Sequence, residues 1–231
     1  MTINELKIAC YLYERFTGFD IDYINLIQVG NLDLTRANHI NSLIKWLRKW
    51  GCRQFKVENT NMSIRNLQQW YLENLSRLPE LQINLHSCTD EYIINFVQLF
   101  NSLANTKISE RNNNNKLISV SVGAVGAAKI LFALRPNVFS PWDKPIYKHL
   151  KYHSTGESYV SYLINNKKLI IDLQTECEQN GFEITDLPQR INRPISTFPK
   201  IIDEFNWVNI TRNCSTSEMI NLILNKRVLN P

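Results

Sequence analysis

Glycine is scarce in this chain of 231 residues, and its cysteines show no paired spacing. Seven glycines leave few positions for the tight turns that join the strands of all-β proteins. The five cysteines are odd in number and include no C-x-x-C pair, which argues against a disulfide framework and against a zinc knuckle. The histidines have no metal-ligand spacing either. We therefore expect a cytoplasmic protein in a reducing environment, without a metal cofactor.

The sequence also lacks an uninterrupted apolar run long enough to cross a membrane. Its most apolar segment, residues 117–134, has Lys129 well inside it, and a lysine within the bilayer is costly. The first sixteen residues carry Glu5 and Glu14 and show no basic region followed by an apolar block. We expect neither a membrane partner nor a signal peptide.

The overall composition is that of a globular protein with a moderate excess of positive charge. Hydrophobic residues make up 44% and charged residues 20% of the chain, so a packed core is expected. The net charge of +5 favours an anionic partner such as nucleic acid. We predict a single α-helical unit over residues 1–231, built as one body or as two helical lobes, and a monomer.

Helical spacing of apolar residues dominates the chain and predicts an all-α fold. Thr2 is placed to cap a helix over residues 2–16, and Gly51 to end one over 33–50. Residues 21–29 alone suggest a strand, and the RNNNNK run at 111–116 is typical of a polar surface loop. The other predicted helices cover residues 63–78, 90–103, 157–180 and 215–227, the last with a capping box from Ser215 to Glu218.

The stretch SVSVGAVGAAKILFALRPNVFSPWD, residues 119–143, has an unusual composition that several kinds of structure could explain. A phosphate loop is excluded, because GAVGAAKI has no Gly-Lys pair and no hydroxyl after the lysine. A buried helix over 124–135, ended by Pro136, accounts for the small residues. Asp143 could then be no more than the N-cap of a helix that begins at Lys144 and Pro145.

Residues 119–150, SVSVGAVGAAKILFALRPNVFSPWDKPIYKHL, resemble the helix-hairpin-helix signature of the DNA glycosylase superfamily. Residues 119–123 match its hairpin, Ala127 falls four residues after Gly123, and Asp143 falls twenty after Gly123, as in the mismatch-adenine branch. The sequence departs from the signature at Val120, where the family has proline, and at Ser121, where it has the first glycine. The resemblance places the hairpin and catalytic loop at 117–150.

The resemblance implies a role for several residues of this segment. Asp143 would be the catalytic carboxylate, which stabilises positive charge on the deoxyribose and activates water. Trp142 and Tyr147 would stack on a base flipped out of the duplex, with Phe139 behind them; for Phe139, simple core packing is the favoured alternative. The residues implied in binding DNA phosphates are Ser121, Val122, Gly123, Ala124, Val125, Lys129, Lys144 and Lys148.

Two further features of the family are missing from this sequence. Members that cleave the DNA strand place a lysine two residues after the second hairpin glycine, where this chain has Val125. Lys129 lies four residues further on and is expected to face solvent or DNA. After Asp143 the chain has only Cys177 and Cys214, too few to bind the family's iron–sulfur cluster. We therefore expect a monofunctional enzyme without a cofactor.

The sequence thus predicts a DNA glycosylase that flips a modified or mispaired base out of duplex DNA and hydrolyses its N-glycosidic bond, leaving an abasic site. Its role would lie in DNA repair or in defence against phages with modified bases. The alternative is a non-catalytic helix-hairpin-helix protein that binds DNA or a protein partner.

Overall fold

The computed structural model describes residues 1–114, 116–215, 217, 218 and 221. The chain is mostly helical and carries one small two-stranded antiparallel sheet, which agrees with the predicted helical class. No helix in the described part of the chain is both long and apolar enough to span a membrane. The α-helices are α1 (Ile3–Phe16), α2 (Phe19–Ile27), α3 (Ala37–Lys49), α4 (Thr60–Asn74), α5 (Asp90–Ile94), α6 (Phe96–Asn105), α7 (Gly123–Leu134), α8 (Lys144–His149), α9 (Gly156–Gln179), α10 (Leu187–Arg190) and α11 (Phe198–Asn206).

Shorter elements complete the fold. The two strands are β1 (Lys107–Asn113) and β2 (Lys116–Ser121), which lie between α6 and α7. Single helical turns occur at η1 (Val57–Asn59), η2 (Leu75–Arg77), η3 (Leu85–Ser87), η4 (Ile184–Asp186) and η5 (Trp207–Thr211), the last a π-turn that continues α11.

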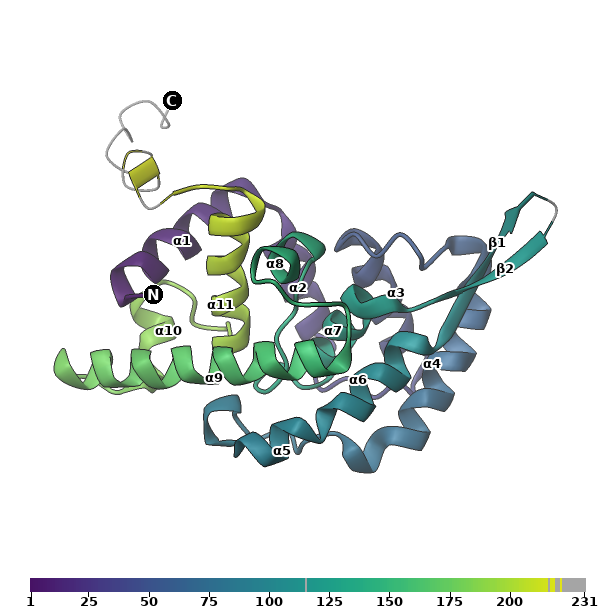
Figure 1. Ribbon diagram of the computed structural model, residues 1–231, viewed down its shortest axis with the longest axis horizontal. Coiled ribbons are helices and arrows are strands. Elements are labelled where there is room, and N and C mark those ends of the chain that lie inside the picture. The colour runs from purple at the N-terminus through teal and green to yellow at the C-terminus, as the bar shows by residue number, and fades with distance from the viewer. Residues whose placement is uncertain (115, 216, 219–220, 222–231) are drawn as a thin grey trace.

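Helix α7 lies at the centre of the molecule, with α3 and α6 packed against it (Figure 1). The first helix, α1, packs against α11 near the other end of the chain, and the long helix α9 contacts α5, α6 and α11. One cluster of buried apolar side chains joins these parts, from Leu6 of α1 through Leu43 and Phe100 to Ile202 of α11. The two ends of the chain therefore share one core with the central helix.

Local sequence signals explain where several helices begin. Thr2 and Glu5 form a complete capping box at α1, since the side chain of each accepts a hydrogen bond from the backbone N–H of the other. Thr155 caps α9 through Ser158, and Pro145 stands in the first turn of α8, where its missing N–H costs nothing. These starts agree with the sequence analysis to within a residue or two.

The structure corrects two predictions of local structure. Residues 19–27 form helix α2 and not a strand. Tyr23 and Leu26 are three residues apart and are both buried, and this spacing puts them on one face of a helix. The Asn-rich run at 111–116 is exposed at its described residues, as predicted, but it is only partly a loop: residues 111–113 end β1, Asn114 lies in the turn and Lys116 begins β2. The strands pair antiparallel from Lys107 with Ser121 to Asn113 with Lys116.

The predicted C-terminal helix over residues 215–227 lies largely outside the described residues. Its capping box is present: the backbone N–H of Glu218 donates to Ser215 Oγ at 3.3 Å, and the backbone N–H of Ser215 donates to Glu218 Oε2 at 2.7 Å.

Candidate functional site

Asp143 and Lys129 form an ion pair beside the central helix. Lys129 Nζ lies 2.7 Å from Asp143 Oδ1 and donates a hydrogen bond of 2.7 Å to the backbone carbonyl of Trp50. The lysine is 4% exposed as a residue, while the Asp143 side chain is 32% exposed. We expected Lys129 to face solvent or DNA, and this prediction is wrong. The lysine faces inward and fixes the carboxylate.

The loop before α8 sets the position of Asp143. Trp142 is fully buried and donates from Nε1 to the backbone carbonyl of Ala124, at 3.3 Å, in the first turn of α7. The hydroxyl of Tyr159 donates to the carbonyl of Ser140 at 2.9 Å, and Ser140 Oγ donates to the carbonyl of Pro199 at 3.0 Å. The loop thus lies back along α7 and is tied to α9 and α11, so the carboxylate stands on a rigid support.

Asp143 occupies the N-cap position of α8 but does not cap that helix. Its backbone is extended, and its side chain accepts no hydrogen bond from the first turn. Aspartate at this position ordinarily satisfies a free backbone N–H there. Here the carboxylate turns to Lys129 instead, with Oδ1 paired and the side chain a third exposed. The capping explanation considered for this residue is therefore wrong.

A second carboxyl group lies within electrostatic range of this ion pair. Asp203 of α11 is 7% exposed, and its backbone carbonyl accepts a hydrogen bond from the N–H of Trp207. Burial raises the pKa of Asp203 to about 8; Lys200 and Lys129 oppose the rise, while Asp143 and Glu204 add to it. At neutral pH the two acids thus differ: one is a paired carboxylate, the other an uncharged acid. Nothing in the local sequence around Asp203 predicted its raised pKa.

The structure divides the predicted base-stacking residues. Trp142 and Phe139 are fully buried: Phe139 packs edge-on against Phe96, and Trp142 contacts Phe100, Tyr159 and Tyr162. They form core and cannot receive a base, which corrects the expectation for Trp142 and agrees with the favoured alternative for Phe139. Tyr147 is half-buried with its ring 5.1 Å from Trp142, and it remains the candidate for a stacking contact.

Tyr147 also lines a cavity next to α8. Its volume of about 600 Å³ lies within the ~300–1,000 Å³ typical of ligand pockets. Lys148 is exposed there, as is Lys144 at the start of α8. The three predicted residues Lys144, Tyr147 and Lys148 thus all lie on α8, the helix that follows Asp143. The cavity is lined by Tyr147, Lys148, Lys151, Tyr152, His153 and Ser154.

The predicted hairpin is replaced by the β-ribbon. Ser121 is the last residue of β2, where its Oγ accepts a hydrogen bond of 3.1 Å from Lys107 Nζ. The N–H of Val122 donates to the carbonyl of Thr106 at 2.9 Å, so it is not free to hold a phosphate. Gly123, with φ +71°, Ala124 and Val125 form the first turn of α7, where an α-helix leaves N–H groups without intrahelical partners. For these three, phosphate binding remains a prediction.

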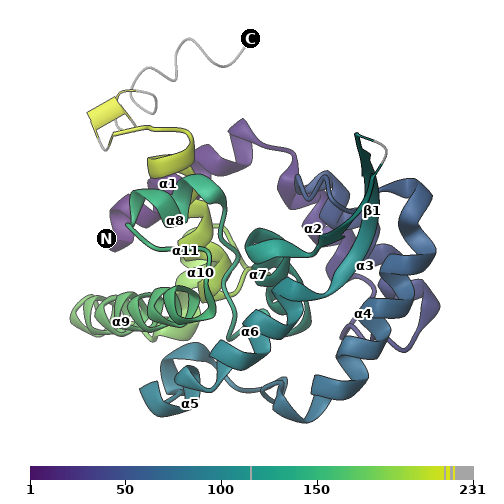
Figure 2. The same cartoon turned by 45° about the vertical axis from the view of Figure 1, so that its right-hand side comes forward.

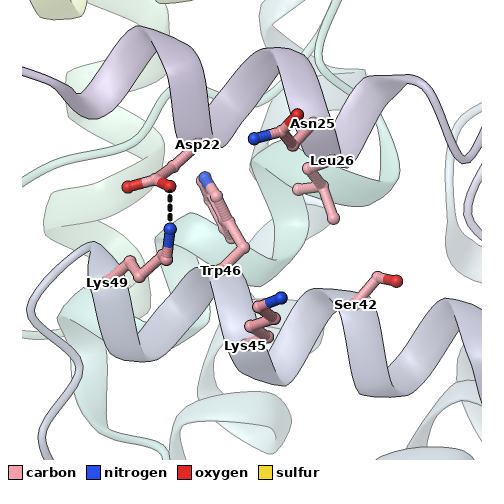
Figure 3. Close-up of a pocket in the computed structure, with 7 residues that line it drawn as sticks. All are labelled: Asp22, Asn25, Leu26, Ser42, Lys45, Trp46 and Lys49. Atoms are coloured by element: carbon pink, nitrogen blue, oxygen red, sulfur yellow. Dashed lines mark hydrogen bonds and ion pairs between the residues drawn. The ribbon is translucent and has the colours of Figure 1, made fainter.

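A polar pocket of about 330 Å³ between α2 and α3 is a second place where charged groups meet (Figure 3). Lys49 is paired with Asp22 there, and Trp46 Nε1 is buried without a hydrogen-bond partner. The Lys49 side chain is 51% exposed, so this pair is worth little energetically. Lys129 is 4% exposed, so its pairing with Asp143 requires a charged group to be removed from water, which the pairing of Lys49 with Asp22 does not. We therefore place the candidate site at Asp143.

Trp50 connects the two places. Its ring lies 4.5 Å from that of Trp46, and its carbonyl accepts the hydrogen bond from Lys129. Among the described residues, no group of three potential ligand side chains is arranged to hold a metal ion. Comparisons of the chain with protein-family models, curated proteins and solved structures found no match.

Proposed function

We propose that the protein is a monofunctional DNA glycosylase that hydrolyses the N-glycosidic bond of a modified or mispaired base. The supporting observation is the state of Asp143, a partly exposed carboxylate that leaves its helix N-terminus uncapped and is fixed by a buried lysine. A residue that served only to cap α8 would accept a hydrogen bond from the first turn of that helix and would not need a buried lysine. The duplex DNA substrate and a role in repair or antiviral defence belong to the same proposal. In it, the likeness to a helix-hairpin-helix protein is carried by the turn at Gly123, helix α7 and Asp143, because a β-ribbon stands where the hairpin was predicted.

The proposed chemistry assigns the two oxygens of Asp143 different tasks. Oδ1 is paired with Lys129, whereas Oδ2 has no ion-pair partner among the described residues and is available to the substrate. As the bond from C1′ to the base nitrogen breaks, its electron pair leaves with the base, which takes up a proton from solvent. The carboxylate stabilises the positive charge on the sugar and accepts a proton from the water whose oxygen bonds to C1′. The proton that the carboxylate accepts is later returned to solvent.

Lys129 has a positioning role in this proposal. Its Nζ orients Asp143 through the 2.7 Å contact with Oδ1, while the hydrogen bond to the Trp50 carbonyl holds the Nζ itself. Lys129 Nζ is buried and contacts both the Asp143 carboxylate and the Trp50 carbonyl, so it is not presented to the sugar. Borohydride treatment of the reacting complex is therefore expected to trap no covalent adduct, and a trapped adduct at Lys129 would overturn the monofunctional assignment.

The first test is base release by Asp143→Asn. Damaged duplexes and phage-derived DNA are screened by mass spectrometry for bases that the wild type releases. On a substrate so found, Asp143→Asn is expected to bind DNA with unchanged affinity and to release no base. Asp172→Asn, on the exposed surface of α9, is the matched control and should keep the wild-type rate.

Lys129→Met separates positioning from chemistry. Methionine fills a similar volume without charge, so the variant should fold and retain DNA binding. Its base release should fall about 100-fold, the scale on which misplaced catalytic groups slow reactions. If the wild type released no base from any substrate, the protein would be a non-catalytic DNA-binding module instead.

A further inference from the structure

The β-ribbon between α6 and α7 projects beyond the helices (Figures 1 and 2). Its base is tied to the body by three hydrogen bonds. Ser63 Oγ donates to the carbonyl of Ile108 at 2.7 Å, Asn66 Nδ2 donates to the carbonyl of Lys107 at 2.8 Å, and the N–H of Glu110 donates to Asn59 Oδ1 at 3.3 Å. Beyond Glu110, the described residues of both strands are exposed as far as Ser119.

The outer half of the ribbon has no core of its own. An isolated two-stranded hairpin is at best marginally stable in water, so a ribbon of this kind gains from a surface that it can contact. Two apolar side chains on β2 are left in solvent: Leu117 is 63% exposed and Ile118 is 36% exposed. Neither contributes to the core, and they lie on opposite faces of the ribbon, Leu117 opposite Asn112 and Ile118 opposite Arg111. A partner on the second of these faces would cover Ile118.

The strand register sorts the charges onto one face. Arg111 pairs with Ile118 and Asn113 pairs with Lys116, and residues that face each other across antiparallel strands share a face. Both cations of the outer ribbon therefore lie on one side together with Ile118. The one acid of the ribbon, Glu110, lies on the other face, opposite Ser119.

Further positive charge surrounds the base of the ribbon. Arg53 and Arg65 are both exposed. Their sequence neighbours place them near the ribbon: Gln54 donates to the carbonyl of Val122 at 2.6 Å, and Asn66 donates to a carbonyl of β1. Between residues 34 and 72 the chain carries seven lysines and arginines and a single acid, Glu58. The ribbon thus extends from the most one-sidedly basic part of the sequence, and a polyanion complements its charge.

We infer that the outer half of the ribbon is a second DNA-binding element, which enters a groove of duplex DNA. Paired strands lie about 4.8 Å apart, so a two-stranded ribbon fits the major groove, about 12 Å wide. Arg111 and Lys116 contact phosphates, and Ile118 faces the base edges. This inference takes its partner from the proposed function.

The ribbon is placed to act together with Asp143. The N–H of Val122, which follows β2, is bonded to Thr106 at the end of α6, so ribbon and α7 are rigidly joined. Trp142, next to Asp143, is bonded to Ala124 in the first turn of α7. A duplex bound by the ribbon would therefore be held in a fixed position relative to α7, with its register set by contacts that are not themselves catalytic.

Two ribbon variants test this inference by fluorescence anisotropy on a labelled duplex. Arg111→Gln with Lys116→Gln removes the two phosphate contacts. Binding should weaken roughly 10-fold near physiological salt, and the slope of log K against log salt should fall by about 2. The control, Lys7→Gln with Lys168→Gln, removes the same charge from exposed positions on α1 and α9 and should leave both quantities unchanged.

The second variant shortens the ribbon. Replacing residues 111–118 with Asn-Gly joins Glu110 to Ser119, which are paired in the native register, and keeps the buried base. It should bind the duplex as weakly as the charge variant while melting at the wild-type temperature. Duplex binding equal to that of the control would overturn the inference, as would a loss of self-association without a loss of DNA affinity.

The outcomes for ribbon and catalysis are distinguishable. If Asp143 is required for base release but both ribbon variants bind DNA like the control, the proposed function stands and the ribbon inference is wrong. If no base is ever released but the ribbon variants lose duplex affinity, the ribbon inference stands without the enzyme.

Discussion

At the scale of single residues, the pairing of Lys129 with Asp143 could not be read from the sequence. The resemblance singled out Asp143, and its partial exposure is consistent with that choice. The direction of Lys129 depends on how residues 136–142 return along α7, which is set by Trp142 bonding to Ala124 eighteen residues earlier. The sequence places Lys129 four residues after Val125 on the same helix, but it does not show which groups Lys129 contacts.

Asp203 gives a pH-dependent prediction at this scale. Its pKa is about 8 in the folded protein against the ordinary aspartate pKa of 3.8, so between these values the folded state retains a proton that the unfolded state has lost. Stability must therefore fall as pH rises through this window, by about 1.4 kcal/mol per pH unit from this group, and level off above pH 8.

Asp203→Asn should remove that loss. The difference in unfolding free energy between variant and wild type is expected to grow in favour of the variant from pH 5 to pH 8 and then stay constant. Urea unfolding at each pH measures it. Asp172→Asn, on the exposed surface of α9, should run parallel to the wild type. A wild-type curve parallel to that of Asp203→Asn would show that the acid titrates normally in the fold.

At the scale of elements, the helices with strong caps were the predictable ones. α1 and α9 begin beside Thr2 and Thr155, and α8 has Pro145 in its first turn, all features of local sequence. The ribbon was missed because its residues are polar and do not alternate, and because its anchors come from α4. The bond from Ser63 to Ile108 spans 45 residues, a distance over which local patterns carry no information.

The contact between α6 and α9 gives the prediction for this scale. A Cβ added at Gly156 would stand 2.6 Å from the carbonyl oxygen of Val97 and 2.9 Å from the Asn101 side chain. Gly156→Ala is therefore expected to force α9 away from α6 and to lower the unfolding free energy by about 1–3 kcal/mol.

Gly18→Ala is the matched control for Gly156→Ala in the same denaturation experiment. A Cβ at Gly18 meets nothing within 4 Å, and the backbone φ of −95° suits alanine. This variant should be neutral or slightly stabilised, since alanine restricts the unfolded chain. Equal stability of the two variants would show that α6 and α9 can separate without cost.

At the scale of the whole molecule, a buried ionic network joins the two ends of the chain. Glu204 of α11 accepts from Lys200 at 2.7 Å and from Arg193 at 2.8 Å, and Arg193 also donates to the carbonyl of Cys10 in α1. Burial alone would lower the pKa of Lys200, but Glu204, with Tyr13 and Asp20, outweighs it and raises that pKa well above its ordinary value.

Glu204→Gln is expected to destabilise the protein by about 3–5 kcal/mol, because it leaves two buried cations without their shared carboxylate. Chemical denaturation monitored by tryptophan fluorescence measures the change. Glu183→Gln, at an exposed position before α10, is the control and should cost less than 1 kcal/mol. A loss for Glu204→Gln as small as that of the control would mean that Asp20 alone neutralises the cations.

The same network sets the order in which the chain can mature during synthesis. The groups of α1 that bind Arg193 leave the ribosome some 180 residues before Arg193, Lys200 and Glu204 do. Residues 33–134, which include α3, α4, α6, the ribbon and α7, are by contrast contiguous and can pack as they emerge. The nascent chain can therefore complete the surface around α7 before α11 supplies the Pro199 carbonyl that accepts from Ser140, so the loop that carries Asp143 gains this anchor late.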